Sequence, residues 1–215
     1  STLVASEMHA SLAYTWWAQR RGFIRNTLGA GRCDLVMGIP ADDDMVRATR
    51  PYYTSTYVFL SRGADSLRLH SLDDPRLRGL RIGLHFIGDD YHNTPPAQAL
   101  ARRGIVRNVI GYSIYGDYSK PNPPARLIDA VARGEGDVAI VWGPFAGYFG
   151  LRAAVPLVIS PVAPEADPSE SPFTFDIAAG VRRNDTALQA RIDRVLTARQ
   201  ADIKNILSRY GMPLA

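Results

Sequence analysis

An apolar run without polar alternation, Val138–Trp142, is the feature that most constrains the fold. It follows a Gly-Asp pair at 136–137 and stops at a Gly-Pro pair at 143–144. A short run of this kind is typical of a strand buried on both faces, as in a parallel sheet, and the proline suits the first turn of a helix. Because ligands of open α/β sheets bind beyond the carboxyl ends of the strands, we predict that Trp142 and Tyr148 face a binding site.

The same pattern occurs earlier in the chain, at residues 31–40, where a glycine and an aspartate precede an apolar strand that ends in Gly38 and Pro40. Each copy follows a segment of helical character, at 21–28 and at 125–133. Any α/β protein contains such units, so one copy alone is weak evidence. Two copies far apart predict two α/β lobes with a ligand cleft between them.

The chain is predicted to pass between the lobes twice. We assign residues 1–61 and 178–215 to lobe 1, including an amphipathic tail of C-terminal helices, and residues 62–177 to lobe 2. Residues 1–13 have the apolar spacing of a helix end, and the aromatic-rich stretch 12–17 is predicted to be a strand. Because the sequence starts within a helix, we expect that the first strand of lobe 1 is missing from it.

Trp16, Trp17 and Arg20 lie at the end of this predicted strand and are candidate cleft residues. Aromatic rings and guanidinium groups at a cleft mouth favour stacking and anion contacts. The alternative is that one tryptophan belongs to the core and that the arginine is solvated at a helix start. Asp44 closes an acidic run, 42–44, for which a helix cap is one interpretation and a cation contact the other.

Two loops of lobe 2 supply further cleft candidates, which share a position just past predicted strands: Asp89, Asp90, Tyr91 and Tyr115. A histidine beside carboxylates can perform acid–base chemistry, and His85 and His92 lie near the two aspartates in the sequence. A strand histidine followed by a polar loop is the simpler interpretation. We therefore assign no catalytic residue.

The composition argues against several classes of function. The chain has 215 residues, of which 46% are hydrophobic and 21% charged, as in a globular protein. Its net charge of +4 is scattered, which argues against nucleic-acid binding, and no apolar run approaches the ~20 residues of a membrane span. The sequence contains no P-loop, no Gly-x-Ser-x-Gly elbow and no zinc-ligand spacing among its histidines. No cofactor or metal is therefore predicted.

The order of these motifs resembles a known family. Residues 31–62, 77–83 and 136–139 are similar to the signature segments of type II periplasmic solute-binding proteins. More specific strings are Tyr-Thr-Trp-Trp-x-Gln-Arg-Arg-Gly-Phe at 14–23, Ile-Gly-Asp-Asp-Tyr-x-Asn-Thr-Pro-Pro at 87–96, and Tyr-Ser-Ile-Tyr-Gly-Asp-Tyr at 112–118. They resemble the MoxJ/XoxJ type, which are solute-binding-like proteins encoded beside quinoprotein methanol dehydrogenases. The resemblance runs nearly end to end.

The resemblance implies a two-lobed α/β fold of the type II periplasmic binding proteins and a location in the periplasm. It also implies a non-catalytic accessory role in methanol oxidation, with a dehydrogenase that carries pyrroloquinoline quinone (PQQ) as the protein partner. Amino-acid-binding relatives place a carboxylate-clamping arginine near residues 42–44, where this sequence is acidic. The alternatives are an ABC-transporter substrate-binding protein for a small polar or cationic solute, and an enzyme that uses Asp89, Asp90 or His92 as acid or base.

Overall fold

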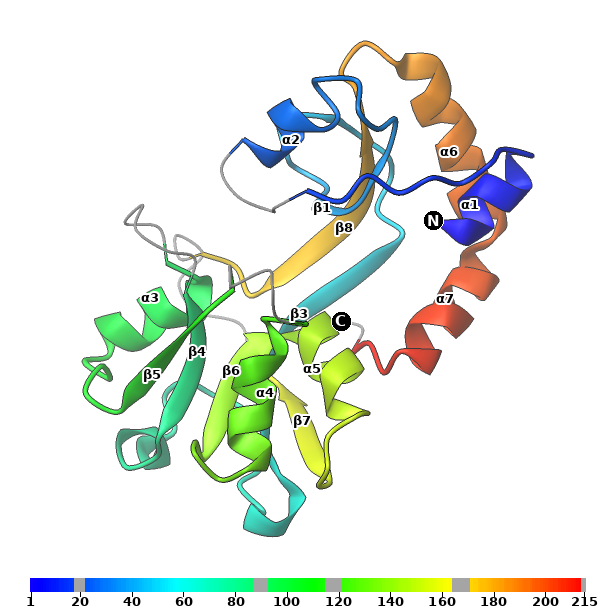
Figure 1. Cartoon of the computed structure of the whole chain (residues 1–215). Coiled ribbons are helices and arrows are strands. Elements are labelled where there is room, and N and C mark those ends of the chain that lie inside the picture. Colours follow the sequence, from blue (N-terminus) through cyan, green and yellow to red (C-terminus); the bar gives the residue numbers. More distant parts are fainter. Residues whose placement is uncertain (18–21, 87–92, 115–120, 164–170, 214–215) are drawn as a thin grey trace. The chain divides into compact units, whose positions relative to one another are not determined.

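The structure, a computed structural model, describes residues 1–17, 22–86, 93–114, 121–163 and 171–213 (Figure 1). The chain divides into two compact units. Unit 1 comprises Ser1–Thr54 and Phe175–Leu207, and unit 2 comprises Ser55–Thr174 and Ser208–Ala215. Residues 208–215 therefore group with unit 2, although they were predicted to belong to lobe 1 with the rest of the C-terminal tail.

Unit 1 is built on an antiparallel sheet. Strand β8 (Thr174–Val181) pairs with β1 (Val36–Pro40) and with the short strand β2 (Arg47–Ala48). Three apolar side chains, those of Leu28, Ile39 and Val46, form a small buried core. The helices of this part of the chain are α1 (Thr2–Glu7), α2 (Phe23–Asn26), α6 (Thr186–Ala198) and α7 (Gln200–Arg209).

The amphipathic tail folds as two helices rather than one. Helix α6 begins at a side-chain cap, because the Asp185 carboxylate accepts a hydrogen bond from the Leu188 N–H at 3.1 Å. The helix ends at Arg199, whose backbone leaves helical geometry, and α7 follows directly. Ile192 on α6 and Ile203 on α7 are both buried, so each helix packs its own apolar stripe.

Unit 2 contains a five-stranded mixed sheet. Strand β3 (Tyr53–Arg62) begins in unit 1 and continues into unit 2, where it pairs antiparallel with β6 (Val138–Trp142) and β7 (Leu157–Pro161). Strand β4 (Ile82–Phe86) runs parallel to both β5 (Val109–Ser113) and β6. Two 3-10 turns, η1 (Gly63–Asp65) and η2 (Pro75–Arg78), lie between β3 and β4. The bounds of β6 are those that the sequence predicts.

Helices cover both faces of the unit 2 sheet, as a fully apolar strand requires. Val138 and Ile140 on β6 pack with residues of α3 (Pro95–Arg102). The alternate residues Ala139 and Val141 pack on the other face with residues of α4 (Ala125–Ala132) and α5 (Gly143–Gly150). Figure 1 shows these two helices next to each other. Residues 138–141 of β6 are therefore all buried.

Three predicted elements differ from the structure. The stretch 12–17 forms no strand in the described part of the chain, although its residues favour one; strand propensity acts only when a neighbouring strand supplies hydrogen bonds. The predicted helix at 21–28 shrinks to the short α2. The sequence favours two strands, at 106–110 and at 112–115, but within the described residues Val109–Ser113 form one strand, β5, which pairs continuously with β4.

Candidate functional site

Three strand ends form one edge of the unit 2 parallel sheet. The register pairs Ile82 with Val138, and Phe86 with Ser113. The strands β4, β5 and β6 therefore end level with one another, at Phe86, Ser113 and Trp142. Ligands of α/β sheets bind beyond such an edge, so the side chains here are the candidate site.

An aromatic group lies at this edge. The half-buried Trp142 faces Tyr57 on the neighbouring strand, with ring centroids 5.5 Å apart and an interplanar angle of 62°. Tyr57 in turn lies 6.3 Å from the buried ring of Phe173 in an edge-on arrangement. Burial raises the pKa of Tyr57 to about 12, so its phenol stays neutral at physiological pH. The group offers apolar surface and stacking contacts without a charge.

Tyr148 belongs to a different set of contacts, farther along α5. Its ring stacks on Tyr210 with centroids 5.8 Å apart, and the Arg152 guanidinium lies 3.8 Å from the ring centroid. Arg152 also donates a hydrogen bond to the Tyr148 carbonyl at 2.7 Å. The sequence predicts both Trp142 and Tyr148 as cleft residues, but their ring contacts are to different neighbours.

The start of α3, which follows β4 in the chain, offers few donors to an anion. Pro95 and Pro96 occupy its first turn, and proline has no backbone N–H. The buried Thr94 hydroxyl donates to the His85 carbonyl at 3.0 Å rather than to a ligand. Because anions bind helix N-termini through free N–H groups, this helix start is poorly suited to hold a substrate carboxylate.

His85 is the buried titratable side chain beside the aromatic edge. The residue is only 3% exposed, Nε2 lies 3.2 Å from the Pro124 carbonyl oxygen, and the Phe145 ring packs against the imidazole edge-on, with centroids 5.7 Å apart. Because the carbonyl can only accept, Nε2 must be the donor. Burial lowers the pKa of His85 to about 4, so the imidazole is neutral at pH 7. A buried, neutral and hydrogen-bonded histidine fits a structural role.

The tryptophans of unit 1 lie on extended, exposed backbone. Trp16 is 85% exposed and Trp17 is 43% exposed, so neither is the core tryptophan that one interpretation required. Trp16 stacks on Tyr14 at 5.5 Å, and the Arg32 guanidinium lies 4.6 Å from the Trp17 ring. Thr15 Oγ1 donates to the Arg32 carbonyl at 2.7 Å, which ties the segment to the loop before β1.

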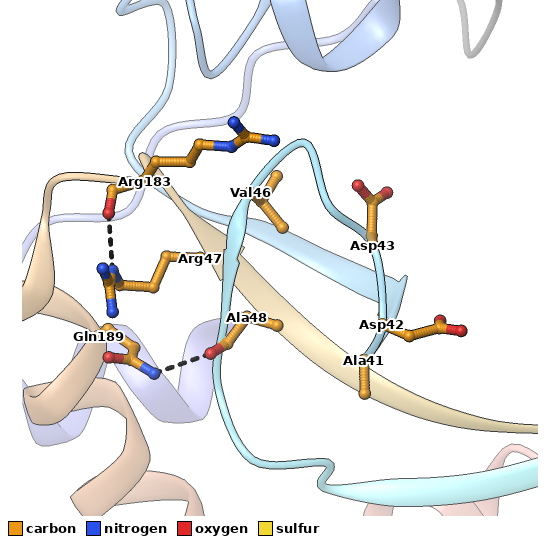
Figure 2. A pocket seen from close by; sticks show the side chains of 8 residues that line it. All are labelled: Ala41, Asp42, Asp43, Val46, Arg47, Ala48, Arg183 and Gln189. Carbon is orange, nitrogen blue, oxygen red and sulfur yellow. Dashed lines mark hydrogen bonds between the residues drawn. The ribbon is translucent and has the colours of Figure 1, made fainter.

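An open hollow of about 480 Å3 lies in unit 1 beside the acidic run. Figure 2 shows its basic and acidic side chains well separated: the Arg47 side chain donates to the Arg183 carbonyl at 2.7 Å, while the carboxylates of Asp42 and Asp43 point away from both. Asp43 also accepts a bond from the Met45 N–H at 2.8 Å. Asp44 is exposed and does not line the hollow. The residues around the hollow are Ala41, Asp42, Asp43, Val46, Arg47, Ala48, Arg183 and Gln189.

Half of the predicted cleft residues lie outside the described residues, namely Arg20, Asp89, Asp90, Tyr91 and Tyr115. Sequence reasoning overlooked Tyr57 and Phe173, which complete the aromatic group around Trp142. Tyr57 lies on β3 and Phe173 directly precedes β8, and their positions at the two predicted crossings between the lobes were the available signal. Among the described residues, no cluster of histidine, cysteine or carboxylate side chains could hold a metal ion.

No helix in the described ranges is long and apolar enough to cross a membrane. No protein-family model matches the chain. Among solved structures, the crystal structure of the periplasmic binding protein XoxJ from Methylobacterium extorquens AM1 is 33% identical, with a TM-score of 0.79, over 100% of this chain and 87% of that one. The crystal structure of MxaJ from Methylophaga aminisulfidivorans is 24% identical, with a TM-score of 0.82, over 100% of this chain and 89% of that one.

Two curated relatives carry the same name. Protein MoxJ of Methylorubrum extorquens is 31% identical over 226 residues, which cover 100% of this chain and 73% of the relative. Protein MoxJ of Paracoccus denitrificans is 25% identical over 99% of this chain and 79% of the relative. These similarities confirm the resemblance that the motifs predicted. The chain belongs to the MoxJ family and has the fold of the type II periplasmic binding proteins.

Proposed function

We propose that this protein is a non-catalytic accessory protein of the periplasm that binds a PQQ-dependent methanol or alcohol dehydrogenase and assists it. The observation that carries the proposal is the similarity to MoxJ of Methylorubrum extorquens, which spans the whole of this chain. The specific strings at 14–23, 87–96 and 112–118 resemble proteins encoded beside such dehydrogenases. The quinone chemistry would belong to the partner, and this chain would supply only binding.

The chemistry of the unit 2 edge supports a protein partner. The half-buried Trp142 and Tyr57, which pack against the buried Phe173, present apolar and aromatic surface, which is the composition favoured at interface anchors. Among the residues that the structure describes, the neutral His85 and the prolines at the start of α3 leave few groups here that would pair with a charged ligand. A carboxylate bound at this edge would lose its hydration without a cationic partner. The edge therefore suits an apolar protein segment better than an amino acid.

A transport receptor for a small polar or cationic solute is the second candidate. The observation that favours it is the hollow in unit 1, which has Asp42 and Asp43 on its rim. Carboxylate oxygens are suitable partners for a cationic group. Against it, Asp43 already accepts a hydrogen bond from the Met45 N–H, and the hollow is open to solvent.

A pull-down with the purified apo-dehydrogenase, run beside a thermal-shift screen of polar and cationic solutes, separates the two candidates. The proposal expects the dehydrogenase to be retained by the immobilised chain, and no solute to raise the melting temperature. A solute that binds the folded chain and is present at a concentration far above its Kd would raise the free energy of unfolding by about 3 kcal/mol. Such a shift, together with no retention of the dehydrogenase in apo or loaded form, would favour the transport receptor instead.

A further inference from the structure

A short strap follows α7 and packs on α5. The strap (residues 210–213) groups with unit 2, although α7 up to Leu207 groups with unit 1. Its contacts fall on Gly143, Gly147, Tyr148 and Leu151 of α5 and the residue after it. The spacing of Gly143, Gly147 and Leu151 by four residues places all three on one side of the helix. The strap therefore runs along a single face of α5.

Two glycines on this face allow the strap to approach the helix backbone. A Cβ at Gly147 would lie 2.0 Å from the carbonyl oxygen of Gly211, and a Cβ at Gly143 would lie 2.7 Å from Cγ of Pro213. Both distances are shorter than real Cβ contacts allow. Glycine costs a helix roughly 1 kcal/mol relative to alanine at an interior position, so the close approach of the strap accounts for glycine at Gly147.

The strap is held at both of its ends. At the near end, Tyr210 stacks on Tyr148 at 5.8 Å and 16°, and Gly211 makes the turn with a left-handed φ of +67°. At the far end, the Ser55 hydroxyl donates to the Pro213 carbonyl at 2.7 Å. The first contact lies on the second turn of α5, and the last lies beside its first residue.

The far end of the strap lies beside Gly143, the residue that follows Trp142. A Cβ at Gly143 would lie 2.7 Å from Pro213 Cγ, 2.7 Å from the Thr56 carbonyl oxygen and 2.9 Å from the Ser55 hydroxyl. Trp142 is the N-terminal cap residue of α5, with an extended backbone. The backbone of Trp142 is held in the sheet by its pairing with Tyr57, so the position of the first turn of α5 acts on the setting of the Trp142 ring against Tyr57.

We propose that the strap is a latch on α5 that positions Trp142 against Tyr57, so that the aromatic edge of unit 2 is complete only while the strap is docked. The latch itself rests on the contacts above. Its effect on partner binding rests in addition on the proposed function. A strap that leaves α5 releases Gly143 from Pro213 and lets the first turn of the helix shift and the Trp142 ring turn away from Tyr57.

Gly147→Ala is the test variant, because its new Cβ meets a backbone oxygen and pushes the strap away without touching Trp142. Gly150→Ala is the matched control: it makes the same substitution in the same helix, and its Cβ would find its nearest neighbour, Ile159 Cδ1, at 3.9 Å. Ser55→Ala, which removes the bond to Pro213, is a second variant in case Gly147→Ala fails to fold. Circular dichroism checks that each variant is folded.

Two readouts need no partner. Trypsin cleavage after Arg209 releases a peptide that begins at Tyr210, and its rate follows the undocked population of the strap. Trp142 fluorescence, recorded in a background with Trp16→Phe and Trp17→Phe, reports whether its ring stays packed. For Gly147→Ala we expect cleavage to rise by about tenfold or more, with a red shift of Trp142 emission. Gly150→Ala should change neither.

The third readout is affinity for the apo-dehydrogenase, which should fall about tenfold for Gly147→Ala and stay unchanged for Gly150→Ala. Faster cleavage with unchanged Trp142 emission would overturn the latch, as would an unchanged cleavage rate in both Gly147→Ala and Ser55→Ala. If Gly147→Ala shifts the Trp142 emission but the wild type does not bind the dehydrogenase, the proposed function is wrong and the latch still holds.

Discussion

Protonation of His85 should destabilise the fold, and the size of the effect follows from its burial. In the folded chain, burial lowers the pKa of His85 from 6.5 to about 4. The unfolded chain therefore binds more protons than the folded chain between these two values. Stability linked to His85 is fully present above pH 6.5 and is lost as pH falls through about 4. The difference of 6.5 − 4 pKa units corresponds to about 3 kcal/mol in the free energy of unfolding.

His85→Phe isolates this contribution, because phenylalanine keeps an aromatic ring against Phe145 but cannot titrate. Urea unfolding followed by circular dichroism at several pH values from 4 to 7 gives the free energy of unfolding of both proteins. The variant loses the bond to Pro124, which costs about 1 kcal/mol at every pH. The wild type should therefore have the larger free energy of unfolding at pH 7. On acidification to pH 4, this free energy should fall by about 3 kcal/mol more in the wild type than in the variant.

An NMR titration of the histidine ring carbons supplies the direct control. Four histidines are present; the signal missing from His85→Phe identifies His85, and it should titrate near pH 4. The reasoning is refuted if that signal titrates near 6.5. It is also refuted if the difference in stability between wild type and variant stays constant across the range.

Three further predictions follow from other contacts. Asp185→Ala removes the side-chain cap of α6 and should cost about 1 kcal/mol in urea unfolding, whereas the exposed Asp44→Ala should cost almost nothing. Tyr57 should resist ionisation until about pH 12 in an ultraviolet titration; an earlier transition assigned by Tyr57→Phe would contradict its burial. Calorimetry with the standard amino acids should give no binding in the micromolar range, since few donors are available at the start of α3, and one clear isotherm would show otherwise.

Local signals in the sequence were enough to predict the elements whose ends they mark. The Gly-Pro pair after Trp142 marks both the end of β6 and the start of α5, and the fully apolar run marks burial on both faces. The motif order was sufficient to place the chain in its family. These features depend on residues that are neighbours in the chain, so a pattern can carry them.

Features that depend on distant partners were missed or mistaken. Residues 12–17 have strand propensity, but no strand forms there in the described part of the chain. The contacts of Tyr57 with Trp142, and of Gly147 with Gly211, join residues far apart in sequence. No local pattern distinguishes Gly147, which receives the strap, from Gly150, which does not.

Affinity for the dehydrogenase is the measurement that tests the central claim most directly. Calorimetric titration of the purified chain into the apo-dehydrogenase should give saturable binding. Trp142→Ala should weaken that binding by roughly 2 kcal/mol, while the exposed Val106→Ala, a residue remote in sequence from the aromatic edge, should bind as the wild type does. Absence of binding to both apo and loaded dehydrogenase would contradict the accessory role, and equal affinities of wild type and a folded Trp142→Ala would remove Trp142 as its anchor.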